Sequence, residues 1–271
     1  MSAAGRGKRK RVAKDYYPTP GYCVRRLLEE VELPGGAWLE PCVGDGAIVR
    51  AVNETRSDIV WYSCEIRDVV PPIKQSHFHH HVDFLKWPTP RHWDVIITNP
   101  SYAIAQETVE KALGLTPVVA MLLRIGFLES ARRNEWVRKH TPSIYILPNR
   151  PSFKWKGSDA TTYSWMVWSR ARPTVKVLKA TSLAERIADR DMAMLVDLFW
   201  KSVNVGRYFG TARGTCWRWK GPIFQGRPTL YKGSHGDPVT LARVLTEKDW
   251  EYQCTTRTCV NPTHQAPRGE A

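Results

Sequence analysis

The chain has 271 residues, of which 42% are hydrophobic, and its formal net charge is +14. The hydrophobic fraction excludes a wholly disordered chain, and the length accommodates one large domain with a small one. No stretch approaches the roughly 20 apolar residues of a membrane-spanning helix, so we expect a cytoplasmic protein. The excess of Lys and Arg favours a polyanionic partner, and nucleic acid is the partner we expect.

Residues 1–14 are basic and lack the apolar core of a secretory signal. They predict a flexible arm that lies on phosphates, with a solvated tail of no particular role as the alternative. Between residues 15 and 180, helix-like and strand-like segments alternate. The helices are expected at Tyr22–Glu32, after a Gly-rich turn as far as about Asn53, and at Gln106–Gly114. The strands are expected in "AWLE", "IVWYSCEI", the short "HVDFLKW", "WDVIITNPSY", "PVVAMLLRI", "PSIYILP" and "TTYSWMVW".

This alternation predicts an α/β fold with a mostly parallel sheet covered by helices on both faces. Ligands of such sheets bind beyond the carboxyl ends of the strands. The run "HFHHH" at His77–His81 has no partnering ligands nearby, so we expect a loop there and no metal site. Cys23, Cys42 and Cys64 are scattered in apolar surroundings and are expected to be reduced thiols.

Acidic residues and glycines gather at the expected strand ends. "LEPCVGDGAI" places Glu40 at a strand end, followed by Gly44-Asp45-Gly46, where glycines permit a tight turn and close approach of a ligand. Glu65 ends the next strand, where its carboxylate suits two ribose hydroxyls, and Asp83 follows later, where it suits an adenine amino group. The spacing of a dinucleotide site or phosphate loop is absent, so a nucleoside without a pyrophosphate fits better.

The ordered set "DYYPTP", "EPCVGDGAI", "CEI", "VDFL" and "DVIITNPSY" resembles the DNA amino-methyltransferases that use S-adenosylmethionine, over about Asp15 to Trp168. The resemblance implies a Rossmann-like domain with a seven-stranded sheet. It also implies three groups of cofactor contacts: Tyr17, Pro18 and Thr19 at the methionine end; Glu40, Gly44, Asp45 and Gly46 under the methionine and ribose; Glu65 on the ribose, with Asp83 and Phe84 around the adenine. Ordinary core packing is the alternative for Phe84.

The same resemblance implies that Asn99-Pro100-Ser101-Tyr102 is the catalytic segment. The Asn99 side-chain oxygen and the Pro100 carbonyl would accept hydrogen bonds from an exocyclic amine and direct its lone pair toward the methyl group. Proline restricts the backbone and aims that carbonyl. Tyr102 would stack on a base rotated out of the duplex. Ser101 departs from the commoner family pattern, which has a second proline there.

Asn at the first position of this segment implies adenine N6 as the target, whereas Ser would imply cytosine. The same four residues also occur in enzymes that act on RNA adenine or on protein glutamine; the basic charge argues against a protein substrate.

A later segment, "NRPSFKWKGSDATTYSWMVW", resembles the family motif whose aromatic side chain packs on the flipped base. Phe153 is our candidate for that role and Trp155 the second choice.

About 50 residues separate the glycine loop from Asn99, which leaves no room for a recognition domain, so we expect recognition to follow the catalytic domain. Residues 206–271 contain Cys216, Cys254, Cys259 and His264, a set that suits tetrahedral zinc. "CWRW" and "CVNPTH" resemble HNH endonuclease domains of phage and bacterial origin. Tyr252 and Ala242 stand where that family has histidines, so we expect a zinc-stapled DNA-binding module that has lost cleavage.

The predicted organisation is a basic arm at 1–14, a methyltransferase domain at 15–180, a connecting helix at 181–205 and the zinc module at 206–271. Within the connecting segment, Ser182–Val203 has the pattern of one amphipathic helix. The expected activity is methylation of adenine N6 in double-stranded DNA, by a protein of phage or prophage origin connected with restriction-modification. Three alternatives remain: an RNA adenine methyltransferase, a zinc nuclease, and a non-catalytic DNA-binding protein such as an anti-restriction factor.

Overall fold

The computed structural model describes residues 17–67, 77–89, 92–153 and 161–190, residue 194, and the backbone of seven short strands between residues 203 and 267. The large α/β unit contains α1 (Gly21–Glu30), β1 (Gly36–Glu40), α2 (Ala47–Asn53), β2 (Ile59–Glu65), β3 (His77–His80), β4 (Val95–Thr98), α3 (Ala105–Leu113), β5 (Val119–Arg124), the 3-10 turns Ile125–Phe127 and Ala131–Arg133, α4 (Asn134–Lys139), β6 (Ser143–Ile146), β7 (Tyr163–Trp168) and β8 (Val175–Val177). Among the described helices, none combines the length and apolar character that crossing a membrane requires.

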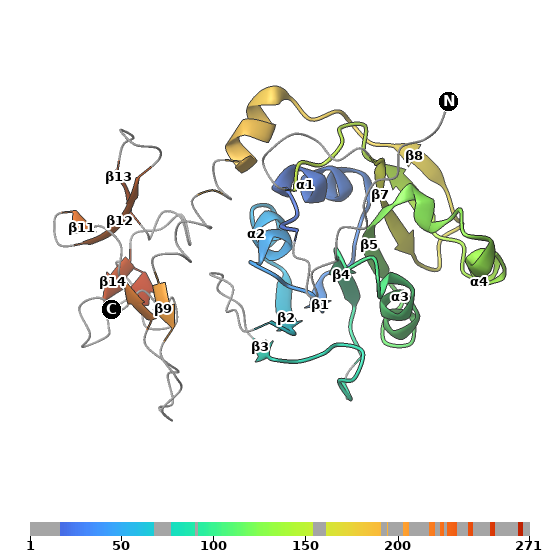
Figure 1. The fold of residues 1–271 in the computed structure, drawn as a ribbon, viewed down its shortest axis with the longest axis horizontal. Coiled ribbons are helices and arrows are strands. Elements are labelled where there is room, and N and C mark those ends of the chain that lie inside the picture. Colours follow the sequence, from blue (N-terminus) through green and yellow to red (C-terminus); the bar gives the residue numbers. More distant parts are fainter. Residues whose placement is uncertain are drawn as a thin grey trace, which may run out of the picture.

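One eight-stranded sheet organises this unit, in the order β3-β2-β1-β4-β5-β7-β6-β8 (Figure 1). The first five strands in this order run parallel, and β7 is antiparallel to both of its neighbours. The expected Rossmann-like, mostly parallel sheet is therefore confirmed, with one strand more than expected. The additional strand is β8, which pairs only with β6 and whose three residues are exposed.

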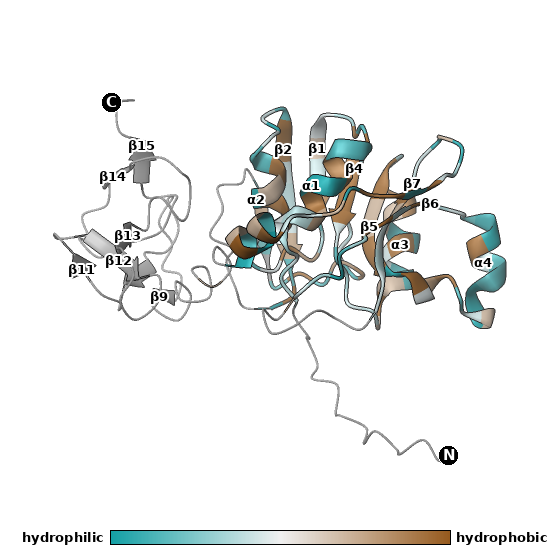
Figure 2. Ribbon diagram, turned by 90° about the horizontal axis from the view of Figure 1, so that it is seen from above, coloured by the Kyte–Doolittle hydropathy of each residue, from teal (hydrophilic) through white to brown (hydrophobic). Residues whose placement is uncertain are grey.

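Two apolar cores lie on the two faces of the sheet because successive strand residues point to opposite sides. Trp38 of β1 packs with α1 and α2 residues such as Leu27 and Val49. Its neighbour Leu39 packs on the other face with Val109 of α3. Figure 2 shows hydrophobic residues along the central strands and hydrophilic residues on the outer sides of the helices, as two-sided burial requires.

The run His77–His80 is a strand, so the expectation of a loop there is wrong. It forms β3, at the edge of the sheet, and pairs in parallel with residues 62–65 of β2. An edge strand gains its backbone hydrogen bonds from one side only and tolerates polar side chains, which explains why its composition gave no strand pattern. The segment from His81 to Trp87, with Asp83 inside it, follows β3 and forms turns, so the expectation of a short strand at "HVDFLKW" is wrong.

Backbone at residues 183–190 and at 194 is helical, within the expected connecting helix. Ser182 caps the start: its Oγ accepts from the Glu185 N–H at 3.2 Å, and Glu185 Oε2 accepts from the Ser182 N–H at 2.9 Å. This is a capping box. The predicted end is wrong, because Val203 begins a strand that pairs with Trp219.

The seven remaining strands form three small antiparallel sheets, and none of them pairs with the large sheet. Their bounds are β9 (Val203–Val205), β10 (Trp217–Trp219), β11 (Ile223–Phe224), β12 (Arg227–Tyr231), β13 (Pro238–Thr240), β14 (Trp250–Tyr252) and β15 (Gln265–Pro267). The sheets pair β9 with β10, β11 with β12 and β13, and β14 with β15. Ala242 lies outside the described residues, and Tyr252 ends β14.

Candidate active site

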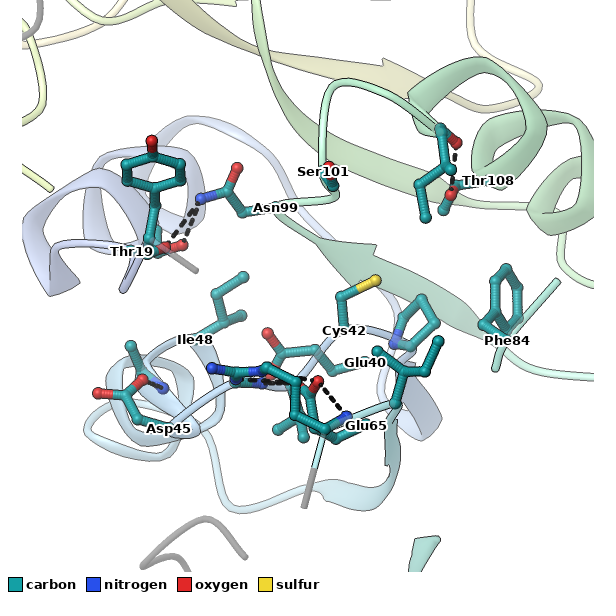
Figure 3. A pocket seen from close by; sticks show the side chains of 18 of the residues that line it. Thr19, Glu40, Cys42, Asp45, Ile48, Glu65, Phe84, Asn99, Ser101 and Thr108 are labelled. Carbon is teal, nitrogen blue, oxygen red and sulfur yellow. Dashed lines mark hydrogen bonds and ion pairs between the residues drawn. The ribbon is translucent and has the colours of Figure 1, made fainter. Parts of the chain in front are cut away.

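A cleft opens at the carboxyl ends of β1, β2 and β4, where parallel strands of the sheet end along one edge. Nine of the ten residues expected to contact a cofactor line it: Tyr17, Pro18, Thr19, Glu40, Gly44, Asp45, Glu65, Asp83 and Phe84. Asn99 and Ser101 line it as well. Figure 3 shows Phe84 at the opposite end of the cleft from Thr19, with Glu40 and Glu65 between them.

The loop between β1 and α2 forms one wall of the cleft. Gly44 and Gly46 have φ angles of 59° and 79°, in the left-handed region that favours glycine, and Gly46 is the N-cap residue of α2. The Gly46 N–H donates to the Val43 carbonyl at 2.8 Å, which closes the turn. Gly46 does not itself line the cleft; it shapes the loop that places Gly44 and Asp45 there.

Glu65 lies at the end of β2 and is 5% exposed. Its Oε2 accepts from the Gly44 N–H at 2.9 Å, so β2 and the glycine loop are joined. Arg67 donates to the same carboxylate from its backbone N–H, Nε and Nη2, at 3.0, 2.9 and 3.1 Å. Burial tends to raise the pKa of Glu65, but these hydrogen bonds and the Arg67 charge lower it. The carboxylate is therefore held ionised.

Glu40, at the end of β1, has the opposite environment. It is 2% exposed, and its Oε2 has no hydrogen-bond partner within the described residues. Burial, reinforced by the nearby Asp45 carboxylate, raises the pKa of Glu40 well above its usual value. A positively charged group placed in the cleft would stabilise the ionised form and satisfy the unpaired oxygen.

The turn after β3 carries Asp83 and Phe84. Phe84 belongs to the core under α3 and also lines the cleft, so both of its expected roles are compatible with its position. Lys111 of α3 fixes this turn: its Nζ donates to the carbonyls of Phe84, Leu85 and Trp87 at 2.6, 3.2 and 2.6 Å. Sequence reasoning missed Lys111, because a lysine on an amphipathic helix is usually solvated.

The Asn99 side chain follows β4 and is oriented by hydrogen bonds from its own amide nitrogen. Nδ2 donates to Thr19 Oγ1 at 3.1 Å and to the Tyr17 carbonyl at 3.4 Å. Figure 3 shows Nδ2 directed at Thr19 and Oδ1 directed away from it. No described residue donates to Oδ1 or to the Pro100 carbonyl. Asn99 Oδ1 is therefore an unengaged acceptor beside the cleft, whereas Pro100 is buried between two residues that line the cleft and does not itself line it.

Tyr102 is 38% exposed, and two other side chains, Tyr163 and Arg124, contact it. Its hydroxyl is hydrogen-bonded to that of Tyr163. The Arg124 guanidinium lies 4.1 Å from the Tyr102 ring centroid, and its Nε donates to Tyr163 Oη at 3.0 Å. Arg124 and Tyr163 are register partners on β5 and β7. Burial, with the Tyr163 hydrogen bond, raises the pKa of Tyr102, so the hydroxyl is neutral. The sequence motifs did not single out either supporting residue.

Phe153 is 6% exposed and packs in the core beneath the cleft. Its ring meets those of Tyr17 and Tyr163 edge-on, at centroid distances of 6.1 and 5.0 Å. It does not line the cleft, so contact with a base stays a prediction that requires this packing to open. The second choice, Trp155, lies outside the described residues.

The expected zinc ligands also lie outside the described residues: Cys216, Cys254, Cys259 and His264. Within the part of the chain that the structure describes, no cluster of three or more His, Cys, Asp or Glu side chains could hold a metal. The zinc site therefore stays a prediction, which metal analysis of the purified protein would test.

Neither the protein-family models nor the curated proteins include a match to this sequence. Among solved structures, the chain is similar to a Listeria monocytogenes protein assigned to the class I S-adenosylmethionine-dependent methyltransferases, at 12% identity over 65% of this chain and 68% of that one, with a TM-score of 0.43. It is also similar to the methyltransferase subunit of a type I restriction-modification system from Streptococcus thermophilus, at 14% identity over 74% and 55% of the two chains (TM-score 0.43). A third is the 23S rRNA methyltransferase ErmE, at 15% identity over 69% and 80% of the chains (TM-score 0.42).

Proposed function

We propose that the protein is an S-adenosylmethionine-dependent methyltransferase acting on the 6-amino group of adenine in DNA. The observation that carries the proposal is the orientation of Asn99. Its amide nitrogen is engaged by Thr19 and Tyr17, so its oxygen faces outward beside a cleft that contains two buried carboxyl groups.

Three features of the cleft support this choice of cofactor. Glu65 offers an ionised carboxylate for ribose hydroxyls, which would share it with Arg67. Glu40 offers an unpaired oxygen to a cationic methionine moiety, and Asp83 and Phe84 line the far end, where adenine is expected. When bound, S-adenosylmethionine supplies an electrophilic methyl group on a positively charged sulfur.

The chain contributes positioning and hydrogen bonding to the transfer. An exocyclic amine has two N–H groups, and Asn99 Oδ1 and the Pro100 carbonyl are two neighbouring acceptors. Accepting both hydrogen bonds localises the nitrogen lone pair away from the ring and directs it into the cleft. After methylation the amine nitrogen is positively charged and loses one of its protons to solvent.

The choice of substrate rests on two features of the chain. Asn at position 99 favours adenine through the resemblance described above, and the net charge of +14 favours a polyphosphate strand. Tyr102 presents a partly exposed ring beside Asn99, fixed by Tyr163 and Arg124, on which a base rotated out of its stack can lie.

The test is methyl transfer from labelled S-adenosylmethionine to unmethylated duplex DNA, with RNA and a duplex lacking adenine alongside, followed by nucleoside mass spectrometry. We expect N6-methyladenine from DNA. We expect Asn99→Ala to lower kcat by at least about 100-fold with little change in cofactor Kd. Transfer only to RNA would correct the substrate, and cofactor binding without transfer to any nucleic acid would overturn the proposal.

A further inference from the structure

A second cavity lies beside the first, across the loop that carries the Asn99–Tyr102 segment. Its volume is about 560 Å³, and Tyr102 forms part of its wall, whereas Asn99 and Ser101 face the cofactor cleft. The two cavities are thus adjacent but lined by different residues. None of the motifs that suggested a methyltransferase predicts the second one.

The lining of this cavity is positively charged. Three arginines contribute to it, Arg124, Arg132 and Arg133, against a single acidic side chain, Glu107. Guanidinium groups bind phosphate oxygens with two parallel hydrogen bonds, so arginines gathered in a concave site suit a phosphate ligand.

Two of the arginines are held in place by neighbouring groups. Arg133 Nε donates to the Phe127 carbonyl at 3.0 Å, and its guanidinium lies 4.8 Å from the Phe127 ring centroid. Arg124 Nε donates to Tyr163 Oη at 3.0 Å while the group stacks on Tyr102. These contacts fix both side chains before any ligand binds, which lowers the entropy lost on binding.

Arg132 differs from the other two. It is exposed, and no hydrogen bond or ion pair joins its side chain to a described residue. It lies in the short 3-10 turn Ala131–Arg133, whose last residue, Arg133, packs on Phe127. An unpaired cation at the rim of a basic cavity is available to a ligand without first breaking an ion pair.

We infer that this cavity binds the phosphodiester backbone of the target strand, next to the nucleotide whose base enters the active site. The inference rests on the proposed function, because Tyr102 is where the base would stack and the same side chain borders the cavity. A nucleotide stacked on Tyr102 must carry its sugar and phosphates past that ring, and the basic cavity provides the matching charge.

The test measures binding rather than turnover. Each probe is a duplex with one adenine placed opposite an abasic site, because an unpaired adenine leaves the stack more easily. In a series of such duplexes, one phosphate at a time is replaced by a neutral methylphosphonate. For the unmodified chain we expect one or two positions beside the adenine at which neutralisation weakens binding about 10-fold. Arg132→Gln should weaken binding to the unmodified duplex by a similar factor and remove the sensitivity at one such position.

Arg138→Gln is the matched control, because Arg138 is exposed on the neighbouring helix α4 and does not line the cavity. It should retain the full sensitivity to neutral phosphates. If Arg132→Gln keeps the same sensitivity as the control at every position, the inference is overturned, while methyl transfer to adenine stands unaffected. If Arg132→Gln removes the sensitivity to a neutral phosphate as expected, but the chain methylates no nucleic acid, the proposed function alone is overturned. Failure of the unmodified chain to bind any duplex would overturn both.

Discussion

The amide nitrogen of Asn99 donates to the hydroxyl of Thr19 across 3.1 Å, joining two residues that are 80 positions apart in the chain. Thr19 is 4% exposed and stands between two prolines just before α1, so its hydroxyl has little freedom to move. The bond decides which end of the Asn99 amide faces the substrate. Thr19 is therefore a positioning residue for the proposed acceptor.

Replacing Thr19 with Val removes the hydroxyl while keeping the shape of the side chain. We expect kcat for methyl transfer to fall about 10- to 100-fold, because the Asn99 amide can then rotate away from the productive orientation. Steady-state kinetics at saturating cofactor, together with cofactor Kd from calorimetry, would separate this effect from a loss of cofactor binding.

Thr19→Ser is the control for this prediction, since it keeps the acceptor oxygen and loses only a methyl group. Its kcat should stay within a few-fold of the unmodified chain. If the Val and Ser variants turn over equally well, the hydrogen bond does not orient Asn99.

Glu40 predicts a pH dependence of stability. Its pKa is raised in the folded chain by burial, so at intermediate pH the unfolded chain loses this proton before the folded chain does. The free energy of unfolding should therefore fall as pH rises above the usual carboxyl range, by at most about 1.4 kcal/mol per pH unit from this group. The free energy of unfolding of Glu40→Gln, measured by denaturation between pH 5 and pH 8, should lack the fall that Glu40 causes. The variant should therefore gain stability relative to the unmodified chain toward pH 8.

The same residue makes a prediction about cofactor binding. A cationic ligand beside Glu40 stabilises its ionised form, so binding of S-adenosylmethionine should release protons and tighten as pH rises toward the raised pKa. Calorimetric titrations in buffers of different ionisation enthalpy would measure the number released. Glu40→Gln should release fewer protons; an unchanged number would assign the proton to another group.

Lys111 should support cofactor binding without touching the cofactor. Lys111→Met removes the one side chain that donates to three carbonyls of the Phe84–Trp87 turn, and we expect a loss of about 1–3 kcal/mol in stability. The Phe84 and Trp87 carbonyls keep backbone donors, Trp87 N–H and Thr89 N–H, whereas the Leu85 carbonyl loses the donor it has among the described residues. Cofactor Kd should rise about 10-fold while kcat at saturating cofactor changes little. Lys139→Met, at an exposed position of α4, is the control and should leave Kd unchanged.

The arrangement of the cleft was accessible from the sequence because its main residues sit at strand ends. Glu40, Glu65 and Asn99 each follow an apolar run, and parallel strands bring such ends to one edge of the sheet. Gly44 and Gly46, which have positive φ angles, follow directly after β1, so the sequence also showed where the tight turn lies. Local pattern and sheet topology together were sufficient for these positions.

Contacts between distant polar groups left no such pattern. Lys111 reaches carbonyls 24 to 27 residues away, and Arg124 meets Tyr163 39 residues away. Both depend on how helices and strands pack, which hydrophobic periodicity does not encode for polar side chains. The strand β3 was missed for a related reason: its backbone pairing with β2 outweighs the weak strand preference of its histidines.

The helical segment 183–190 is joined to the start of α1 by Asp189, and this contact predicts a difference between two acidic residues that share one arginine. Asp189 accepts from the Tyr22 N–H at 2.5 Å and pairs with Arg25 at 2.8 Å, with its side chain 11% exposed. Glu54 pairs with the same Arg25 at 2.9 Å but is 44% exposed. Asp189→Ala should lower the free energy of unfolding by about 2 kcal/mol, because it leaves the Tyr22 N–H without its acceptor and the largely buried Arg25 guanidinium with only the exposed Glu54 as a partner. Glu54→Ala should cost no more than about 0.5 kcal/mol, because water replaces an exposed ion pair readily. Urea denaturation of both variants at pH 7 would decide, and equal losses would show that Asp189 contributes only as one more surface charge.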